Sequence, residues 1–251
     1  MPDEDRPLSL GSLLGVVFDL DGTLVTSGHD FKRMRHEVIR IAERHGVTPG
    51  HLSVRDTIPR IMELADSELA LGGVPEGDRF RFEAEVNTTI DAIELEALPK
   101  TVARAGAGEL LKALSAKGYR LAVLTRSSEQ FCRRALAKTG LLDYFPDLRT
   151  RSSPGPPKPS PEALLLLLKQ MEVAPDRCLF IGDHPLDAEC ATRARIRFIG
   201  VLEAAGPPDL ADRLKRGGAM AVAADLPGLG RLLGVPSPRP AAAPGMPSAY
   251  R

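Results

Sequence analysis

Short apolar runs recur along the chain, and each of them ends at a polar residue. These runs are Leu14–Phe18, Leu121–Leu124, Cys178–Ile181 and Phe198–Val201. Each run is short enough to be a strand buried on both faces. Segments with helical periodicity lie between the runs, at Gly108–Lys117, Glu129–Lys138 and Pro161–Met171. Because strands alternate with helices, the pattern predicts βαβ units and a doubly wound parallel α/β sheet.

One long region, from about Val25 to Lys100, lacks this alternation and has a helical pattern throughout. Apolar positions at the 3.6-residue period predict a first helix near residues 31–45, and further helices are predicted near 58–65 and 78–97. In the first helix, the predicted apolar face includes Phe31 and His45. The basic row Arg33, Arg40 and Arg44 falls largely on the other side and is interpreted as a solvated face.

These patterns predict three parts of the chain. Residues 1–24 and 101–233 form the α/β core, and residues 25–100 form an inserted helical cap. The tail at 234–251 contains five prolines and several alanines, which is typical of a disordered extension.

A proline-rich loop precedes the helix at Pro161. It contains Lys158, and it ends at Ser160, which is predicted to be the N-cap residue before a proline at the first helical position. The five leucines at 164–168 follow and predict a helix buried on most sides.

Composition narrows the class of protein. Of 251 residues, 43% are hydrophobic and 26% are charged, which excludes a disordered or fibrous chain. The 33 basic residues balance the 33 acidic ones, so neither nucleic acid nor a membrane is expected as a partner. The three cysteines form no C-x-x-C pair and predict neither a disulfide framework nor a cysteine metal site. Neither a membrane span nor a targeting segment is predicted near the start, so a cytoplasmic location is expected.

The most informative polar segment runs from Asp19 to Leu24 and directly follows the first apolar run. In an extended chain, Asp19 and Asp21 point to the same side, and Gly22 lets the backbone turn and a phosphate approach. Two carboxylates this close favour a divalent cation such as Mg²⁺. The alternatives are a pair of turn-forming aspartates or a calcium loop, but Leu24 stands where the calcium loop requires glycine.

Three further segments follow predicted strands or precede helices. Gly182 and Asp183 follow the third apolar run, and Asp187 comes one helical turn later. Thr125 follows the second run and can donate to phosphate oxygens, or it can be a helix N-cap, as can Ser127 or Ser128. Lys158 can neutralise a phosphoryl group, although a loop lysine is most often solvated. His184 is predicted to be an ordinary loop residue.

In this order, the four segments resemble the motifs of the haloacid dehalogenase-like phosphohydrolase superfamily, over about Gly15 to Leu233. The helical insert resembles the cap of the subgroup that includes phosphoglycolate phosphatases and β-phosphoglucomutases. The resemblance implies that Asp19 is the nucleophile and that Asp21 is the general acid and then the base. It also implies that Thr125 and Lys158 hold the transferring phosphoryl group.

The resemblance further implies a Mg²⁺ site made by Asp19, the Asp21 backbone carbonyl and Asp183, with Asp187 supporting the metal set from nearby. Arg126 departs from the asparagine that is common in the family. It is predicted either to bind a carboxylate or second phosphate of the substrate or to form a surface ion pair. Because family members that release halide lack the second aspartate, Asp21 argues against dehalogenation.

The function predicted from the sequence is therefore Mg²⁺-dependent hydrolysis of a small phosphorylated metabolite. A phosphomutase, which keeps the same core residues, is the alternative enzyme. A binding module on the same fold, with the proline-rich tail engaging a partner, is the alternative without catalysis. The sequence decides neither the identity of the substrate nor the oligomeric state.

Overall fold

A computed structural model describes residues 13–203 and 206–235. The chain divides into two compact units, one of residues 1–26 with 101–251 and the other of residues Ser27–Lys100. We call them the sheet unit and the helical unit. Most of the predicted disordered tail, from residue 236 onward, lies outside the described residues. None of the helices described is both long and apolar enough to cross a membrane.

The sheet unit contains a six-stranded sheet whose strands are all parallel. The strands are β1 (Gly15–Phe18), β4 (Arg120–Leu124), β5 (Asp147–Arg149), β6 (Cys178–Gly182), β7 (Arg197–Val201) and β8 (Ala221–Ala223). Their order is β5-β4-β1-β6-β7-β8, so the chain first extends the sheet on one side of β1 and then on the other. This order is that of a doubly wound sheet, and the predicted fold class is confirmed.

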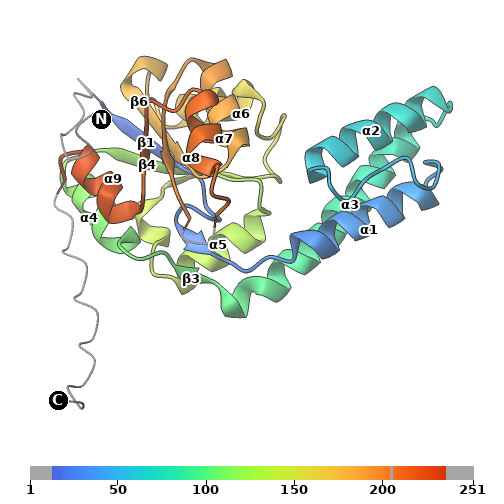
Figure 1. Ribbon diagram of the computed structural model, residues 1–251, viewed down its shortest axis with the longest axis horizontal. Helices are drawn as coiled ribbons and strands as arrows, with labels where there is room; N and C mark the ends of the chain where they lie inside the picture. Colours follow the sequence, from blue (N-terminus) through green and yellow to red (C-terminus); the bar gives the residue numbers. More distant parts are fainter. Residues whose placement is uncertain (1–12, 204–205, 236–251) are drawn as a thin grey trace, which may run out of the picture. The chain divides into compact units, whose positions relative to one another are not determined.

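Helices cover both faces of this sheet (Figure 1). One face carries α4 (Ala107–Ala116), α5 (Glu129–Lys138) and α9 (Leu226–Leu232). The other carries α6 (Pro161–Gln170), α7 (Pro185–Ala194) and α8 (Leu210–Arg216). Two short 3₁₀ helices, η2 (Leu142–Tyr144) and η3 (Pro175–Arg177), lie in the connections. Val235, which the sequence assigns to the tail, is buried, and its N–H donates to the Gly230 carbonyl at 3.0 Å.

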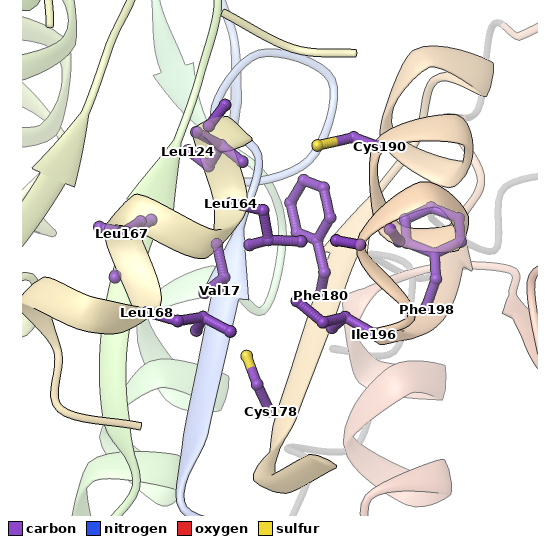
Figure 2. Close-up of a cluster of buried hydrophobic side chains, with 14 of the residues drawn as sticks. Val17, Leu124, Leu164, Leu167, Leu168, Cys178, Phe180, Cys190, Ile196 and Phe198 are labelled. Carbon is purple, nitrogen blue, oxygen red and sulfur yellow. The ribbon is translucent and has the colours of Figure 1, made fainter. Parts of the chain in front are cut away.

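The core between the sheet and helices α6 and α7 is shown in Figure 2. Val17 of β1 and Phe180 of β6 meet Leu164 of α6 there, and the rings of Phe180 and Phe198 lie edge to face at 5.8 Å. Helix α6 is not buried on most sides, which corrects the prediction made from the leucine run. Leu164, Leu167 and Leu168 are buried, whereas Leu165 and Leu166 are 39% and 43% exposed, because a helix on one face of a sheet keeps a solvent side.

The two chain segments that connect the units pair with each other. They form an antiparallel ribbon of β2 (Val25–Thr26) and β3 (Val102–Ala103), in which Thr26 lies opposite Val102. The chain therefore leaves the sheet unit and returns to it at the same place.

The helical unit consists of α1 (Phe31–Arg44), α2 (Ile58–Leu71), α3 (Glu76–Ala97) and the 3₁₀ helix η1 (Leu98–Lys100). Its three long helices share a core of their own, which includes Val38, Ile61 and Phe82. Phe31 is 48% exposed, which departs from the predicted apolar face. The basic row is solvated as predicted, and its three arginines pair with Glu96, Glu37 and Glu85.

Candidate active site

The candidate site lies at the carboxyl ends of the central strands β1, β4 and β6. Asp19 directly follows β1, Thr125 follows β4 and Asp183 follows β6. The backbone N–H of Asp19 donates to the Ile181 carbonyl at 2.8 Å, so the two chain segments remain paired where the acids begin. The strand order reverses between β1 and β6, and such a switch point is where doubly wound sheets bind ligands.

Lys158 connects two of these segments through a buried ammonium group. Its Nζ donates to Asp19 Oδ1 at 2.6 Å and to Asp187 Oδ1 at 2.7 Å, although Asp19 lies 139 residues away along the chain. Lys158 is only 3% exposed, and Nζ lies 5.7 Å from the centroid of the Phe180 ring. The structure thus brings this loop residue against Asp19, and the solvated alternative for Lys158 is wrong.

Three carboxylates converge around this lysine. One oxygen from each of Asp19, Asp183 and Asp187 lies within 4.8 Å of the others. Burial raises the pKa of Asp19 to about 7; Lys158 opposes this rise and Asp187 adds to it. Burial, Asp19 and Asp187 likewise hold the pKa of Asp183 well above its usual range. When ionised, the three carboxylates would carry more negative charge than one ammonium compensates, which is why the pKa values of Asp19 and Asp183 are raised.

The turn after β1 fits closely around Asp183. Gly22 has a φ of +82°, and a Cβ atom there would lie 2.3 Å from Asp183 Oδ2. Thr23, which is fully buried, donates from Oγ1 to Asp183 Oδ1 at 2.5 Å. Gly22 is thus required both by its backbone conformation and by the approach of Asp183. The sequence reasoning did not select Thr23, although its place on the acidic turn was a usable signal.

Asp21 lies on the same turn and is half-buried. Its backbone is bridged to Val25, and the neighbouring N–H of Gly22 donates to the Val25 carbonyl at 2.8 Å. Its charge also acts on Asp183, whose pKa it helps to raise. Asp21 therefore belongs to the same charged cluster.

Asp187 holds Lys158 in place, and both of its oxygens have partners. Oδ1 accepts from Lys158, and Oδ2 accepts from the backbone N–H of His184 at 3.0 Å. The support that Asp187 is expected to give to the metal set stays a prediction.

His184 is the N-cap of α7, and its Nδ1 accepts from the Leu186 N–H at 3.2 Å. The prediction of His184 as an ordinary loop residue is therefore corrected. An unprotonated ring nitrogen accepts there as an asparagine oxygen would.

Thr125 is buried at the end of β4, and its hydroxyl oxygen accepts from the Ser127 N–H at 3.1 Å. Ser128, not Thr125, is the N-cap of α5 and accepts from the Phe131 N–H at 3.3 Å.

Arg126 donates from its guanidinium group to the backbone carbonyl of Lys158. Neither of the two predictions for this arginine included that contact. Its contact with substrate stays a prediction.

A family model described as haloacid dehalogenase-like hydrolase matches residues 14–195, which is more than half of the chain and includes every residue of this site. The chain belongs to the haloacid dehalogenase-like hydrolase family. The resemblance inferred from the four segments is thereby confirmed.

Individual relatives agree with this assignment. The chain is 28% identical over 228 residues to a phosphoglycolate phosphatase of Rhodospirillum rubrum, with 89% of this chain and 92% of the relative covered. It is 32% identical over 198 residues to an N-acetylmuramic acid 6-phosphate phosphatase of Pseudomonas aeruginosa, with 75% and 81% covered. A crystal structure of a haloacid dehalogenase-like protein of Agrobacterium tumefaciens has the same fold. Its TM-score is 0.62 at 23% identity, covering 88% of this chain and 98% of that one.

Proposed function

We propose that this hydrolase is a Mg²⁺-dependent phosphatase that cleaves a small phosphomonoester through an aspartyl-phosphate on Asp19. The observation that carries the proposal is the cluster in which buried Lys158 contacts Asp19 and Asp187, while one carboxylate oxygen of Asp183 lies within 4.8 Å of an oxygen of each of these two aspartates. Such a site offers a nucleophile, a fixed positive charge and oxygen ligands for a cation. Phosphoryl transfer requires these groups above all.

The donor set suits Mg²⁺. Asp19 and Asp183 would hold the ion together with the backbone carbonyl of Asp21, and carboxylate and carbonyl oxygens are the ligands that a hard cation prefers. The excess of buried negative charge, expressed in the raised pKa values of Asp19 and Asp183, is what a cation would compensate. When bound, Mg²⁺ supplies charge neutralisation for the phosphoryl group.

In the first step, a carboxylate oxygen of Asp19 forms a bond to phosphorus as the bond from phosphorus to the ester oxygen breaks. Asp21 gives its proton to the departing alkoxide, so an alcohol leaves. In the second step, Asp21 accepts a proton from water while the water oxygen attacks phosphorus. The bond to Asp19 then breaks, and inorganic phosphate is released with both aspartates restored.

The neighbouring groups position the phosphoryl oxygens. Lys158 lies within hydrogen-bond distance of Asp19, so its ammonium can offset charge on both the nucleophile and the transferring group. The Thr125 hydroxyl and the backbone N–H groups after β4 would donate to the same oxygens. Arg126, which donates to the Lys158 carbonyl, would support this loop.

We place the substrate among small phosphorylated metabolites, because the two relatives described above are phosphatases of phosphoglycolate and of N-acetylmuramic acid 6-phosphate. Residues 25–100 would serve as the cap that confers specificity. Closure of a cap excludes water until the leaving group departs.

The test is a phosphate-release assay on a panel of sugar and organic-acid phosphates, with Mg²⁺ or with EDTA. We expect Mg²⁺-dependent release and a labile phosphoryl group on Asp19 in acid-quenched enzyme. Asp19→Asn should lower kcat on the order of 10⁶-fold, as loss of a covalent nucleophile does elsewhere. Asp176→Asn, which removes an exposed carboxylate, is the matched control.

Two outcomes contradict the proposal. Full activity of Asp19→Asn would exclude Asp19 as the nucleophile. Transfer of the phosphoryl group to a second hydroxyl of a sugar phosphate, with little free phosphate, would show a mutase instead.

A further inference from the structure

We propose that Arg104 is a positioning residue that holds the acidic turn after β1 in its active geometry. The inference rests on the proposed phosphatase function and adds to it a residue outside the four recognised segments. Arg104 lies immediately after β3, in the segment by which the chain returns to the sheet unit. It is half-buried and belongs wholly to the sheet unit.

The guanidinium group of Arg104 bridges two loops at the carboxyl edge of the sheet. One amino group donates to the backbone carbonyl of Gly22. The other donates to the carbonyl of Leu202, which directly follows β7, at 2.6 Å. The planar guanidinium fork can make two such bonds with little loss of freedom, whereas an ammonium group lacks that fixed geometry.

The main chain of Arg104 adds a third contact to the same turn. Its N–H donates to the Leu24 carbonyl at 2.9 Å. Gly22 and Leu24 are therefore both held from outside the turn by one residue. Within the turn, the Leu24 N–H donates to the Leu20 carbonyl at 2.8 Å, so the bonds to Arg104 join an already ordered structure to the returning chain.

The position of the held carbonyl links Arg104 to the chemistry. Gly22 stands between Asp21, the proposed acid and base, and Thr23, which donates to Asp183. A shift of the Gly22 peptide would move both neighbours. Misplacement by about 1 Å can cost on the order of 10²-fold in rate even when the displaced group lies away from the reacting atoms. Arg104 thus supports the turn through the backbone carbonyls of Gly22 and Leu24.

Arg120 provides a matched control, because it makes the same kind of contact elsewhere. Its guanidinium donates to the Met171 carbonyl at 2.5 Å, from the first residue of β4 and hence at the opposite edge of the sheet. Arg104→Met and Arg120→Met remove the same charge and the same donors. They differ in the loop that loses its support.

The experiment measures kcat and KM with p-nitrophenyl phosphate and follows thermal unfolding. We expect Arg104→Met to lower kcat by about 10²-fold with little change in KM, and Arg120→Met to leave both near the wild-type values. Arg104→Lys should recover part of kcat, because one ammonium can reach one of the two carbonyls. A second readout is Mg²⁺ affinity, obtained from melting temperature against Mg²⁺ concentration, which should fall for Arg104→Met because Asp21 precedes the held peptide.

Equal kcat and Mg²⁺ affinity in Arg104→Met and Arg120→Met would overturn the role of Arg104 while leaving the phosphatase proposal intact. If wild type releases no phosphate, the proposed function fails, and the Mg²⁺ comparison still decides whether Arg104 holds the turn. If Arg104→Met does not fold, the kcat and melting temperature of Arg104→Lys test the proposal instead. Reduced kcat at an unchanged melting temperature supports the proposal, and wild-type kcat overturns it.

Discussion

Among individual residues, Asp19 and Asp183 would have to lose their protons to bind a cation, so metal binding at the proposed site would compete with protonation. In metal-free protein, the pKa of Asp19 is raised from 3.8 to about 7, and that of Asp183 is raised as well. The unfolded chain releases these protons at lower pH than the folded chain does. The raised pKa values therefore make the metal-free protein progressively less stable as the pH rises from about 4 to about 7.

We predict that Mg²⁺ stabilises the wild-type protein more at pH 8 than at pH 5.5, because the ion must displace fewer protons at the higher pH. The measurement is the difference in melting temperature between samples in MgCl₂ and in EDTA at each pH. Asp19→Asn is the control and should show a smaller difference at pH 8. A shift that is as large at pH 5.5 as at pH 8 contradicts the prediction.

Alanine variants of two glycines can distinguish backbone strain at Gly22 from the steric clash of a Gly22 side chain with Asp183. Gly22→Ala places a side chain at positive φ and puts Cβ 2.3 Å from Asp183 Oδ2. Gly118→Ala is the matched control, because φ is +80° there and nothing lies within 4 Å. We predict that both variants lose about 1–2 kcal/mol or more of unfolding free energy from the left-handed conformation. Only Gly22→Ala should also lose Mg²⁺ binding and most of the activity.

Urea denaturation and phosphate release measure these two effects separately. If Gly118→Ala loses activity as severely as Gly22→Ala, the close packing of Gly22 on Asp183 is not what the site requires.

The sequence predicts which polar residues follow strands, but it does not predict their hydrogen-bond partners. Asp19 and Asp183 could be predicted because each ends an apolar run and the ends of parallel strands meet at one edge. The bond from Thr23 to Asp183 and the bonds of Arg104 could not, because they join residues far apart in the chain. Such pairings depend on loop paths that local patterns do not encode.

Among the secondary structure elements, the ones that could be predicted from the sequence are those with a long buried apolar run. The runs at β1, β4, β6 and β7 are buried almost throughout and were predicted. Strands β5 and β8 have only three residues each, and no apolar run marks them. Helix α8 has seven residues and too few turns for a clear period. Short edge elements are stabilised by the sheet they join more than by their own pattern.

The first turn of α7 gives a prediction at this scale. His184→Ala removes the acceptor for the Leu186 N–H and should lower the unfolding free energy by about 1 kcal/mol, as for other N-caps. His184→Asn should keep most of the stability, since asparagine is a favoured N-cap. Urea denaturation of both variants measures the difference. Equal losses in the two variants would exclude a capping role for the ring nitrogen.

In the whole molecule, the ribbon of β2 and β3 brings together the points where the chain enters and leaves the helical unit. Thr26 and Val102 are paired, so an Asn-Gly turn between them can replace residues 27–101. We predict that the shortened protein unfolds cooperatively, because the core around Phe180 contains no residue of the helical unit. It should still be stabilised by Mg²⁺, since Asp19 and Asp183 both remain. Circular dichroism and thermal melts provide the measurement, and a non-cooperative melt would contradict it.

The central place of β1 in the sheet also governs when a newly made chain can become an enzyme. Asp19 is synthesised early, but its partners on the loop before α6 and at the end of β6 emerge only after the helical unit and two more strands of the six-stranded sheet, β4 and β5. Closing so long a loop costs conformational entropy, and this cost arises before the contacts between Asp19 and its partners can stabilise the chain. During synthesis on the ribosome, we therefore expect Asp19, the proposed nucleophile, to stay inactive until β6 pairs with β1, and a chain that ends before that point to lack the assembled site.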